Sequence, residues 1–239
     1  MVQIAANLRT IPDGACGHDC QTVTTALQRV QRAIDGASGR LFTLWAESLG
    51  QPPTPTSSAG WAKLQRCFGI AQDDPLAGIR IELVRGVYDR AATILSSPRC
   101  LISRITDPAI ANGWGFSPIP PAFHPAAGFD YEIQVGQSFL DHADPGFDSS
   151  VQQCGFASTR DLGLLRVTTL VHEAVHWANG QGGHTERGQM FNPFNYELFI
   201  LDLNCNVPAL FFLPPAIRVP QLPQHAPSIF GMPPFRVGT

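Results

Sequence analysis

The segment Leu162–Ala178 constrains the fold of this chain more than any other. Its apolar residues recur at helical spacing, and it contains two histidines and one glutamate, at His172, Glu173 and His176. The positions around these three are uncharged: Leu170, Val171, Ala174, Val175, Trp177 and Ala178. Because these flanking positions present no charged group to water, this part of the segment is predicted to be a buried helix. An isolated carboxylate at Glu173 then requires a partner or a function.

The spacing of the two histidines indicates a metal site. His172 and His176 are four residues apart, so on a helix both imidazoles project from one face, about a turn apart. Zinc binds neutral imidazole, and a catalytic zinc takes three protein ligands and leaves one position for water. Glu173 lies beside the first histidine, where it can reach a metal-activated water, and is the predicted general base. The alternative is a structural helix that carries these residues by chance, which the uncharged flanks disfavour.

The third ligand is left open by the residues themselves. After the helix, Asn179–Gly183 contains glycines that can stop a helix and reverse the chain. His184 and Glu186 follow, and imidazole and carboxylate both bind zinc. A third candidate is Glu197, which lies on the next predicted helix. The metzincin pattern requires a histidine where Gly182 stands, so that class is excluded.

At these residues the chain resembles the deuterolysin and lysine-specific metalloendopeptidase family, the aspzincins. The similarity includes Thr169–Glu173, and Asn192–Phe199 looks like that family's Asn-Ala-Asp-Asn-Tyr-Glu-Tyr-Phe. It extends to an early cysteine before a helical segment, Cys16–Trp45, and to an edge strand ahead of the motif, Tyr131–Val135. The resemblance implies a zincin-like fold, a Zn²⁺ cofactor and endopeptidase activity on a protein or peptide substrate.

The resemblance also implies a ligand and a catalytic tyrosine. In the family, the third ligand is an aspartate in a Gly-Thr-x-Asp-x-x-Tyr turn, and the matching stretch here is Gly183–Glu186. Glu186 is therefore the first choice and His184 the second. The family's tyrosine, which steadies the transition-state oxyanion, would fall at Gln189, so that catalytic role is unfilled unless Tyr196 substitutes.

Substrate preference is expected to differ from the family's. The acidic residues that select lysine there match Phe194 and Glu197 as substrate-binding positions here. Because Phe194 replaces one carboxylate, we expect weaker lysine selectivity or a different preference.

The rest of the chain predicts more helices and a small sheet. The stripe from Val23 to Trp45 is one long helix, or two interrupted at Gly36 and Gly39. Asp74 and Pro75 begin another helix. Its expected buried stripe is Ile79, Leu83, Val87, Ala91 and Ile94. Alternation over Tyr131–Val135 predicts a half-buried strand with Glu132 and Gln134 on the wet side; Leu101–Ile105 is a second strand, and Tyr196–Leu203 is a short helix.

These elements predict an α+β, predominantly α fold. Residues 1–212 form one zincin-like catalytic domain with a small β-sheet beside the active-site helix, and the edge of that sheet could receive an extended peptide. Residues 213–239 form a proline-rich C-terminal tail that is irregular or extended.

Composition excludes some partners. The 239 residues carry a net charge of -3 with scattered Lys and Arg, so the basic surface of a nucleic-acid binder is absent. No apolar run has the length of a membrane span, and the first residues lack a signal-peptide core. The family resemblance nevertheless suggests a secreted or exported protein. Six cysteines predict one or more disulfides of open pairing. The oligomeric state is not fixed by the sequence.

The sequence therefore predicts a zinc-dependent endopeptidase. Two alternatives stay open. One is a zinc-binding pseudo-peptidase that has lost the family's tyrosine. The other is a non-enzymatic helical interaction module, in which the proline-rich tail binds a partner and the histidines are structural.

Overall fold

The fold was established from a computed structural model that describes residues 17–119, 125, 127–141, 159–180 and 189–204. The helices are α1 (Gly17–Ser48), α2 (Ser57–Phe68), α3 (Ala77–Ser96), α4 (Gln137–Asp141), α6 (Thr159–Asn179), the 3₁₀ helix η2 (Gln189–Phe191) and α7 (Pro193–Asn204). The strands are β1 (Cys100–Arg104), β2 (Gly115–Phe116) and β3 (Tyr131–Val135). The predicted α+β, predominantly α class is confirmed.

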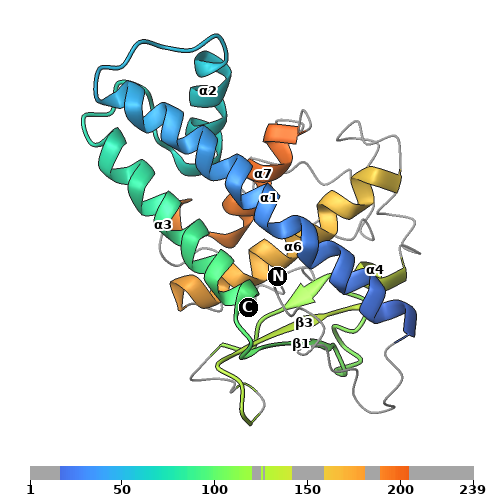
Figure 1. Ribbon diagram of the computed structural model, residues 1–239. Coiled ribbons are helices and arrows are strands. Elements are labelled where there is room, and N and C mark those ends of the chain that lie inside the picture. The colour runs from blue at the N-terminus through green and yellow to red at the C-terminus, as the bar shows by residue number, and fades with distance from the viewer. Residues whose placement is uncertain (1–16, 120–124, 126, 142–158, 181–188, 205–239) are drawn as a thin grey trace, which may run out of the picture.

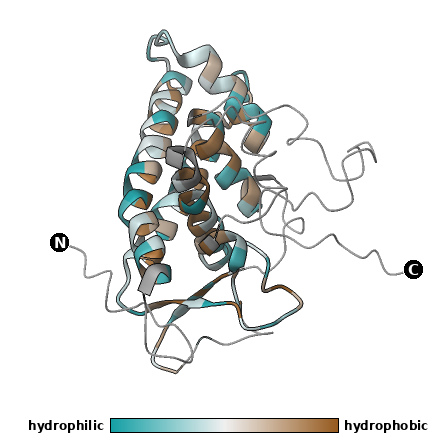
Figure 2. Cartoon of the chain, turned by 90° about the vertical axis from the view of Figure 1, so that its right-hand side faces the viewer, coloured by the Kyte–Doolittle hydropathy of each residue, from teal (hydrophilic) through white to brown (hydrophobic). Residues whose placement is uncertain are grey.

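Helix α6 lies at the centre of this arrangement. It packs against α1, α3 and α7 and also contacts strands β2 and β3. Figure 1 shows α1 and α3 as two long helices beside α6, with the small sheet at the end of the helical layer. In Figure 2 the hydrophobic colour concentrates on the central helices, whereas the outer helices alternate between polar and apolar residues. The most apolar helices are therefore those with neighbours on several sides.

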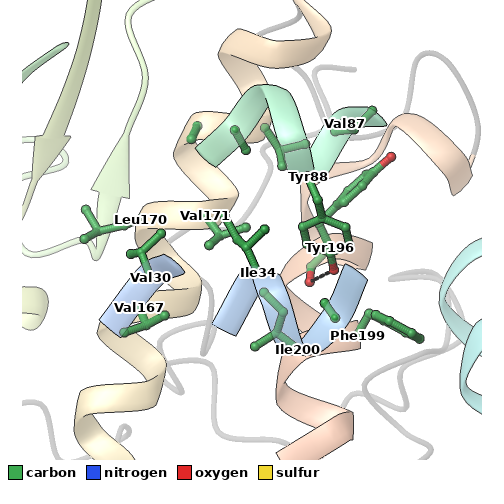
Figure 3. Close-up of a cluster of buried hydrophobic side chains, with 14 of the residues drawn as sticks. Val30, Ile34, Val87, Tyr88, Val167, Leu170, Val171, Tyr196, Phe199 and Ile200 are labelled. Carbon is green, nitrogen blue, oxygen red and sulfur yellow. Dashed lines mark hydrogen bonds between the residues drawn. The ribbon is translucent and has the colours of Figure 1, made fainter. Parts of the chain in front are cut away.

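The burial predicted for α6 is confirmed. Every residue from Val167 to His176 is less than 5% exposed. Figure 3 shows Val171 of this helix beside Ile34 of α1, near Ile200 of α7. The hydroxyl groups of Thr168 and Thr169 donate to the carbonyl of Leu165, which satisfies them inside the helix. The helix ends before Gly180, whose φ of 62° is left-handed and suits glycine.

Helix α1 is continuous over 32 residues, so the two-helix alternative is wrong. Gly36 and Gly39 lie inside it, and a Cβ at either position would meet nothing within 4 Å. Glycine weakens a helix by about 1 kcal/mol, which the burial of the opposite face outweighs. That buried face includes Val30, Ile34 and Leu41.

Helix α3 differs from its prediction in its start and in its buried face. It begins at Ala77, and the Asp74 carboxylate accepts a hydrogen bond from the Leu76 amide at 2.8 Å, so Asp74 caps the turn before the helix. Ile79 and Leu83 are 64% and 51% exposed, so the first half of the predicted stripe is wrong. Apolar residues fit two overlapping stripes, and packing against α1 and α6 selects the second. The residues it buries are Ile81, Val84, Val87, Tyr88, Ala91 and Ile94.

The sheet has the order β1-β3-β2, with β1 parallel and β2 antiparallel to β3. Tyr131–Val135 is therefore the central strand, and its prediction as an edge strand is wrong. The missed edge strand, β2, has two residues and lies in a segment rich in glycine and aromatic residues. The strand predicted at Leu101–Ile105 is confirmed as β1.

Glu132 of β3 is buried, although alternation placed it on the wet side. Its Oε1 accepts hydrogen bonds from Ser103 at 3.0 Å and from Gln134 at 2.9 Å. Both donors belong to the sheet, so the carboxylate is satisfied without water.

The cysteines confirm that the chain contains a disulfide. Cys20 of α1 is disulfide-bonded. Cys67 and Cys100 are free and buried, so the partner of Cys20 lies outside the described residues. The predicted tail at residues 213–239 also lies outside them. Among the helices that the structure describes, none has the length and apolar character needed to cross a membrane.

Candidate metal centre

His172 and His176 lie together on α6, as their spacing predicts. Both side chains are buried, their ring centroids are 5.0 Å apart and the rings are inclined at 66°. Since α6 is surrounded by other helices, both rings are held in a setting with little access to water. Two neighbouring imidazoles in such a place are suited to bind one transition-metal ion.

Glu197 of α7 supports the first of these histidines. The Nδ1 atom of His172 lies 3.0 Å from Glu197 Oε2, and the Thr168 hydroxyl donates to Glu197 Oε1 at 3.2 Å. A carboxylate accepts, so Nδ1 carries the proton and Nε2 is the nitrogen left for a metal. Burial lowers the pKa of His172, but the hydrogen bond that the ring donates to Glu197 and the charges of Glu173 and Glu197 outweigh burial and raise that pKa.

The contact with His172 bears on the two roles predicted for Glu197. Its carboxylate is engaged with the Nδ1 atom of that histidine, as a partner of the imidazole. It is also only 1% exposed and offers no surface to a substrate side chain. The physical reason is the packing of α7 directly on α6, which places Glu197 in the interface between the two helices.

Glu173 has one carboxylate oxygen with no partner. The side chain is 3% exposed, and Oε2 has no hydrogen-bond partner in the described protein. Its backbone carbonyl accepts a hydrogen bond from Ser117 at 2.9 Å, which ties α6 to the segment after β2. Burial raises the pKa of Glu173 to about 7, against the opposing effects of the His172 charge and of the nearby Ser117 hydroxyl. A buried carboxylate oxygen without a partner in the described part of the chain is suited to interact with a further polar group or ligand.

Phe194 of α7 contributes an apolar wall. Its half-buried ring meets the His172 ring edge to face, with centroids 4.7 Å apart. The structure thus brings the predicted substrate-binding residue Phe194 against the predicted metal ligand His172. The Glu197 carboxylate is engaged with His172, and Phe194 carries no charge. Neither of the two predicted substrate-binding residues therefore offers a free acidic group here.

Tyr196 lies in the core instead of facing the histidines. Its ring packs edge to face on Phe68 and Tyr88, with centroid separations of 5.0 Å in both cases. The hydroxyl donates to the Met190 carbonyl at 2.6 Å, and burial raises the pKa of Tyr196. The hydroxyl is therefore committed to the backbone, which does not support the catalytic role predicted for Tyr196.

The described residues bring together two candidate metal ligands, His172 and His176, and no third one. No group of three or more His, Cys, Asp or Glu side chains within them could hold a metal ion. The predicted third ligands, His184 and Glu186, lie outside the described residues. The donor types present, two imidazoles with a carboxylate on Nδ1, fit zinc, which would require one further ligand from elsewhere.

Two residues near β2 adjoin Glu173 and were not predicted from the sequence. Ser117 bonds the Glu173 carbonyl, and Gly115 lies directly against the Glu173 side chain. These contacts join positions more than fifty residues apart in the chain, and no local pattern marks them. In the sequence, Gly115 and Ser117 lie in a segment rich in glycine and aromatic residues, and this composition alone does not predict contact with Glu173.

Comparison of the chain with protein-family models, with curated proteins and with solved structures found no match. Any assignment of function must therefore rest on the chemistry of the site.

Proposed function

We propose that this protein is a zinc-dependent endopeptidase. The observation that carries the proposal is the buried Glu173, whose Oε2 has no hydrogen-bond partner among the described residues. It lies next in sequence to His172, whose ring is hydrogen-bonded to Glu197. Burying the side chains of His172, Glu173 and His176 costs free energy unless each is paired or binds a ligand. A helix with a purely structural role gains nothing from that cost.

His172 and His176 would hold the metal, together with Glu186 or His184 as the third ligand. Bound zinc supplies Lewis acidity, which polarises a carbonyl and makes water nucleophilic near neutral pH. The donor set favours zinc over magnesium or calcium, which prefer oxygen ligands.

Glu173 would transfer a proton from water to the leaving amine. Its carboxylate accepts a proton from water as the new carbon–oxygen bond forms at the peptide carbonyl. It then delivers that proton to the amine as the carbon–nitrogen bond breaks. The pKa of about 7 that burial gives Glu173 in the metal-free chain is close to the range in which one group can act as base and then as acid.

The substrate side chain beside the scissile bond is proposed to be apolar or only weakly selected for charge. Phe194 lines His172, and Glu197 is engaged with Nδ1 of that ring. Because neither Phe194 nor Glu197 presents a free carboxylate to the substrate, strong selection for lysine is not expected. The substrate would add along the outer edge of β2, the edge strand nearest Glu173.

An exported location is part of the proposal. The disulfide at Cys20 supports it, because disulfides persist chiefly in oxidising compartments.

The test is zinc stoichiometry combined with a peptidase assay on the wild type and Glu173→Gln. We expect about one zinc per chain in both proteins and a loss of kcat of at least 100-fold in the variant. Glu82→Gln, on the exposed side of α3, is the matched control and should keep full activity. A metal-free wild type, or a fully active Glu173→Gln variant, would refute the proposal.

One second candidate has an observation in its favour. Because the Tyr196 hydroxyl is bonded to Met190, it does not replace the tyrosine that the resemblance requires. A zinc-binding pseudo-peptidase with little turnover fits that packing. Bound zinc without hydrolysis of any peptide in a mixed library would identify it.

A further inference from the structure

The glycine at position 115 leaves a space that the Glu173 side chain occupies. A Cβ atom at this position would lie 2.7 Å from Glu173 Oε1, 2.8 Å from Cγ and 3.0 Å from Cδ. Carbon atoms in proteins pack at about 3.5–4.0 Å, so these separations are repulsive. Any larger residue at position 115 is therefore incompatible with the observed position of the Glu173 carboxylate.

Space, and not backbone conformation, explains this glycine. Gly115 is not among the glycines with positive φ, which in the described residues are Gly50, Gly69, Gly128 and Gly180. It lies in β2 opposite Val135 of β3, in a conformation that alanine can also adopt. The three atoms that a Cβ at position 115 would meet most closely, among the described residues, all belong to the side chain of Glu173.

The backbones on both sides of this contact are held in place. Strand β2 pairs with β3 at Gly115 and Phe116, and the Gly136 amide donates to the Trp114 carbonyl at 3.0 Å. On the other side, Ser117 donates to the Glu173 carbonyl and fixes the strand to α6. A methyl group added at position 115 would therefore displace the Glu173 side chain more readily than it would separate strand and helix.

We propose that Gly115 is a positioning residue for Glu173: the missing side chain on the edge strand sets where the carboxylate of the general base lies. The inference rests on the proposed peptidase function for its consequence in catalysis. The contact itself can be tested without any activity.

The first experiment is a stability cycle on the full chain in the presence of a chelator. Gly115→Ala is expected to lower the melting temperature by roughly 5 °C in the wild-type background. In a Glu173→Ala background, where the obstructing atoms are gone, it should change the melting temperature by less than about 1 °C. Gly39→Ala, whose Cβ would meet nothing within 4 Å, is the control and should not destabilise either protein. An equal loss in both backgrounds would overturn the inference.

The second experiment measures the effect on catalysis. Gly115→Ala should keep the wild-type zinc stoichiometry and KM while kcat falls by about 100-fold, because a displacement near 1 Å can cost that much. A kcat within twofold of wild type would overturn the positioning role. A wild-type chain that hydrolyses no peptide, yet shows the coupled melting temperatures, would refute the proposed function and support the contact between Gly115 and Glu173.

Discussion

The hydrogen bond between Glu197 and His172 fixes which ring nitrogen of the histidine is free. The carboxylate belongs to α7 and the imidazole to α6, so the bond depends on how the two helices are rotated against each other. Outer carboxylates of this kind orient a ligand and raise its basicity. In the proposed metal site, Glu197 would therefore influence zinc binding through His172 without being a ligand.

Glu197→Gln is expected to weaken zinc binding by about 10- to 100-fold, because an amide supports the imidazole less well than a carboxylate. Competition with a chromogenic chelator measures the zinc dissociation constant. The far-ultraviolet circular dichroism spectrum should be unchanged. Glu82→Gln on α3 serves as the control for an exposed glutamate, and an unaltered dissociation constant in Glu197→Gln would contradict the supporting role.

Tyr196→Phe separates a structural tyrosine from a catalytic one. The variant loses the hydrogen bond to Met190, so the free energy of unfolding should fall by about 1 kcal/mol. Since the ring stays packed on Phe68 and Tyr88, the kcat for peptide hydrolysis should remain within twofold of wild type. Urea unfolding and steady-state kinetics measure the two quantities. A large fall in kcat at unchanged stability would restore the catalytic role predicted from the sequence.

At this scale, local spacing predicts only part of the site. The shared face of His172 and His176 follows from helical geometry, because four residues make about one turn. The roles of Glu197 and Tyr196 do not, since adjacent positions on α7 face different neighbours. Glu197 contacts His172, whereas Tyr196 contacts Phe68 and Tyr88. The way α7 packs on its neighbours determines which residue of α7 faces the histidine.

Among the elements, α1 and α2 are joined at one carboxylate. Glu47, near the end of α1, accepts hydrogen bonds from the Ser57 hydroxyl and from Trp61 Nε1, the latter at 3.0 Å. The Thr54 amide also donates to it. Burial raises the pKa of Glu47, but the bonds from Ser57, Trp61 and Thr54 and the nearby Arg40 outweigh burial and lower it.

This lowered pKa predicts a pH dependence of stability. Charged Glu47 stabilises the fold above its ordinary pKa of 4.5, and the contribution is lost as the pH falls through the lowered folded value. Because water screens this half-exposed carboxylate, Glu47→Gln should reduce the free energy of unfolding by only about 0.5 kcal/mol at pH 7, and by less near pH 3. Urea unfolding at both pH values measures the difference. A deficit that is the same at both would contradict the argument.

Helices and strands could be predicted where the hydrophobic pattern is long and unambiguous. They could not be predicted where the pattern is short or fits two alternative buried faces. Helix α6 and strand β3 have clear periods and were found. Strand β2 has two residues, too few to show alternation, and it makes β3 central. In α3, Ile79 and Leu83 fit a helical stripe as well as Ile81 and Val84 do, so only the neighbouring helices could select the buried face.

In the whole molecule, the core and the candidate site share one helix. Val171 and Val175 pack into the main hydrophobic core, while His172 and Glu173 stand between them in sequence and His176 follows Val175. Polar groups are therefore buried in the helix that most of the fold packs against. Without a bound ion these groups oppose folding, so metal binding should stabilise the entire chain and not only its surroundings.

Zinc should consequently raise the melting temperature of the protein, and a chelator should reverse the rise. At a free zinc concentration of 100 times the dissociation constant, the native state gains about 2.7 kcal/mol. For a chain of this size that corresponds to roughly 5–10 °C. Differential scanning fluorimetry with zinc and with chelator measures the shift. His172→Ala should abolish it, because one imidazole cannot replace the pair, whereas Glu82→Gln should retain it. If the wild type melts at the same temperature under both conditions, the histidines of α6 are structural and the metal-centre proposal is wrong.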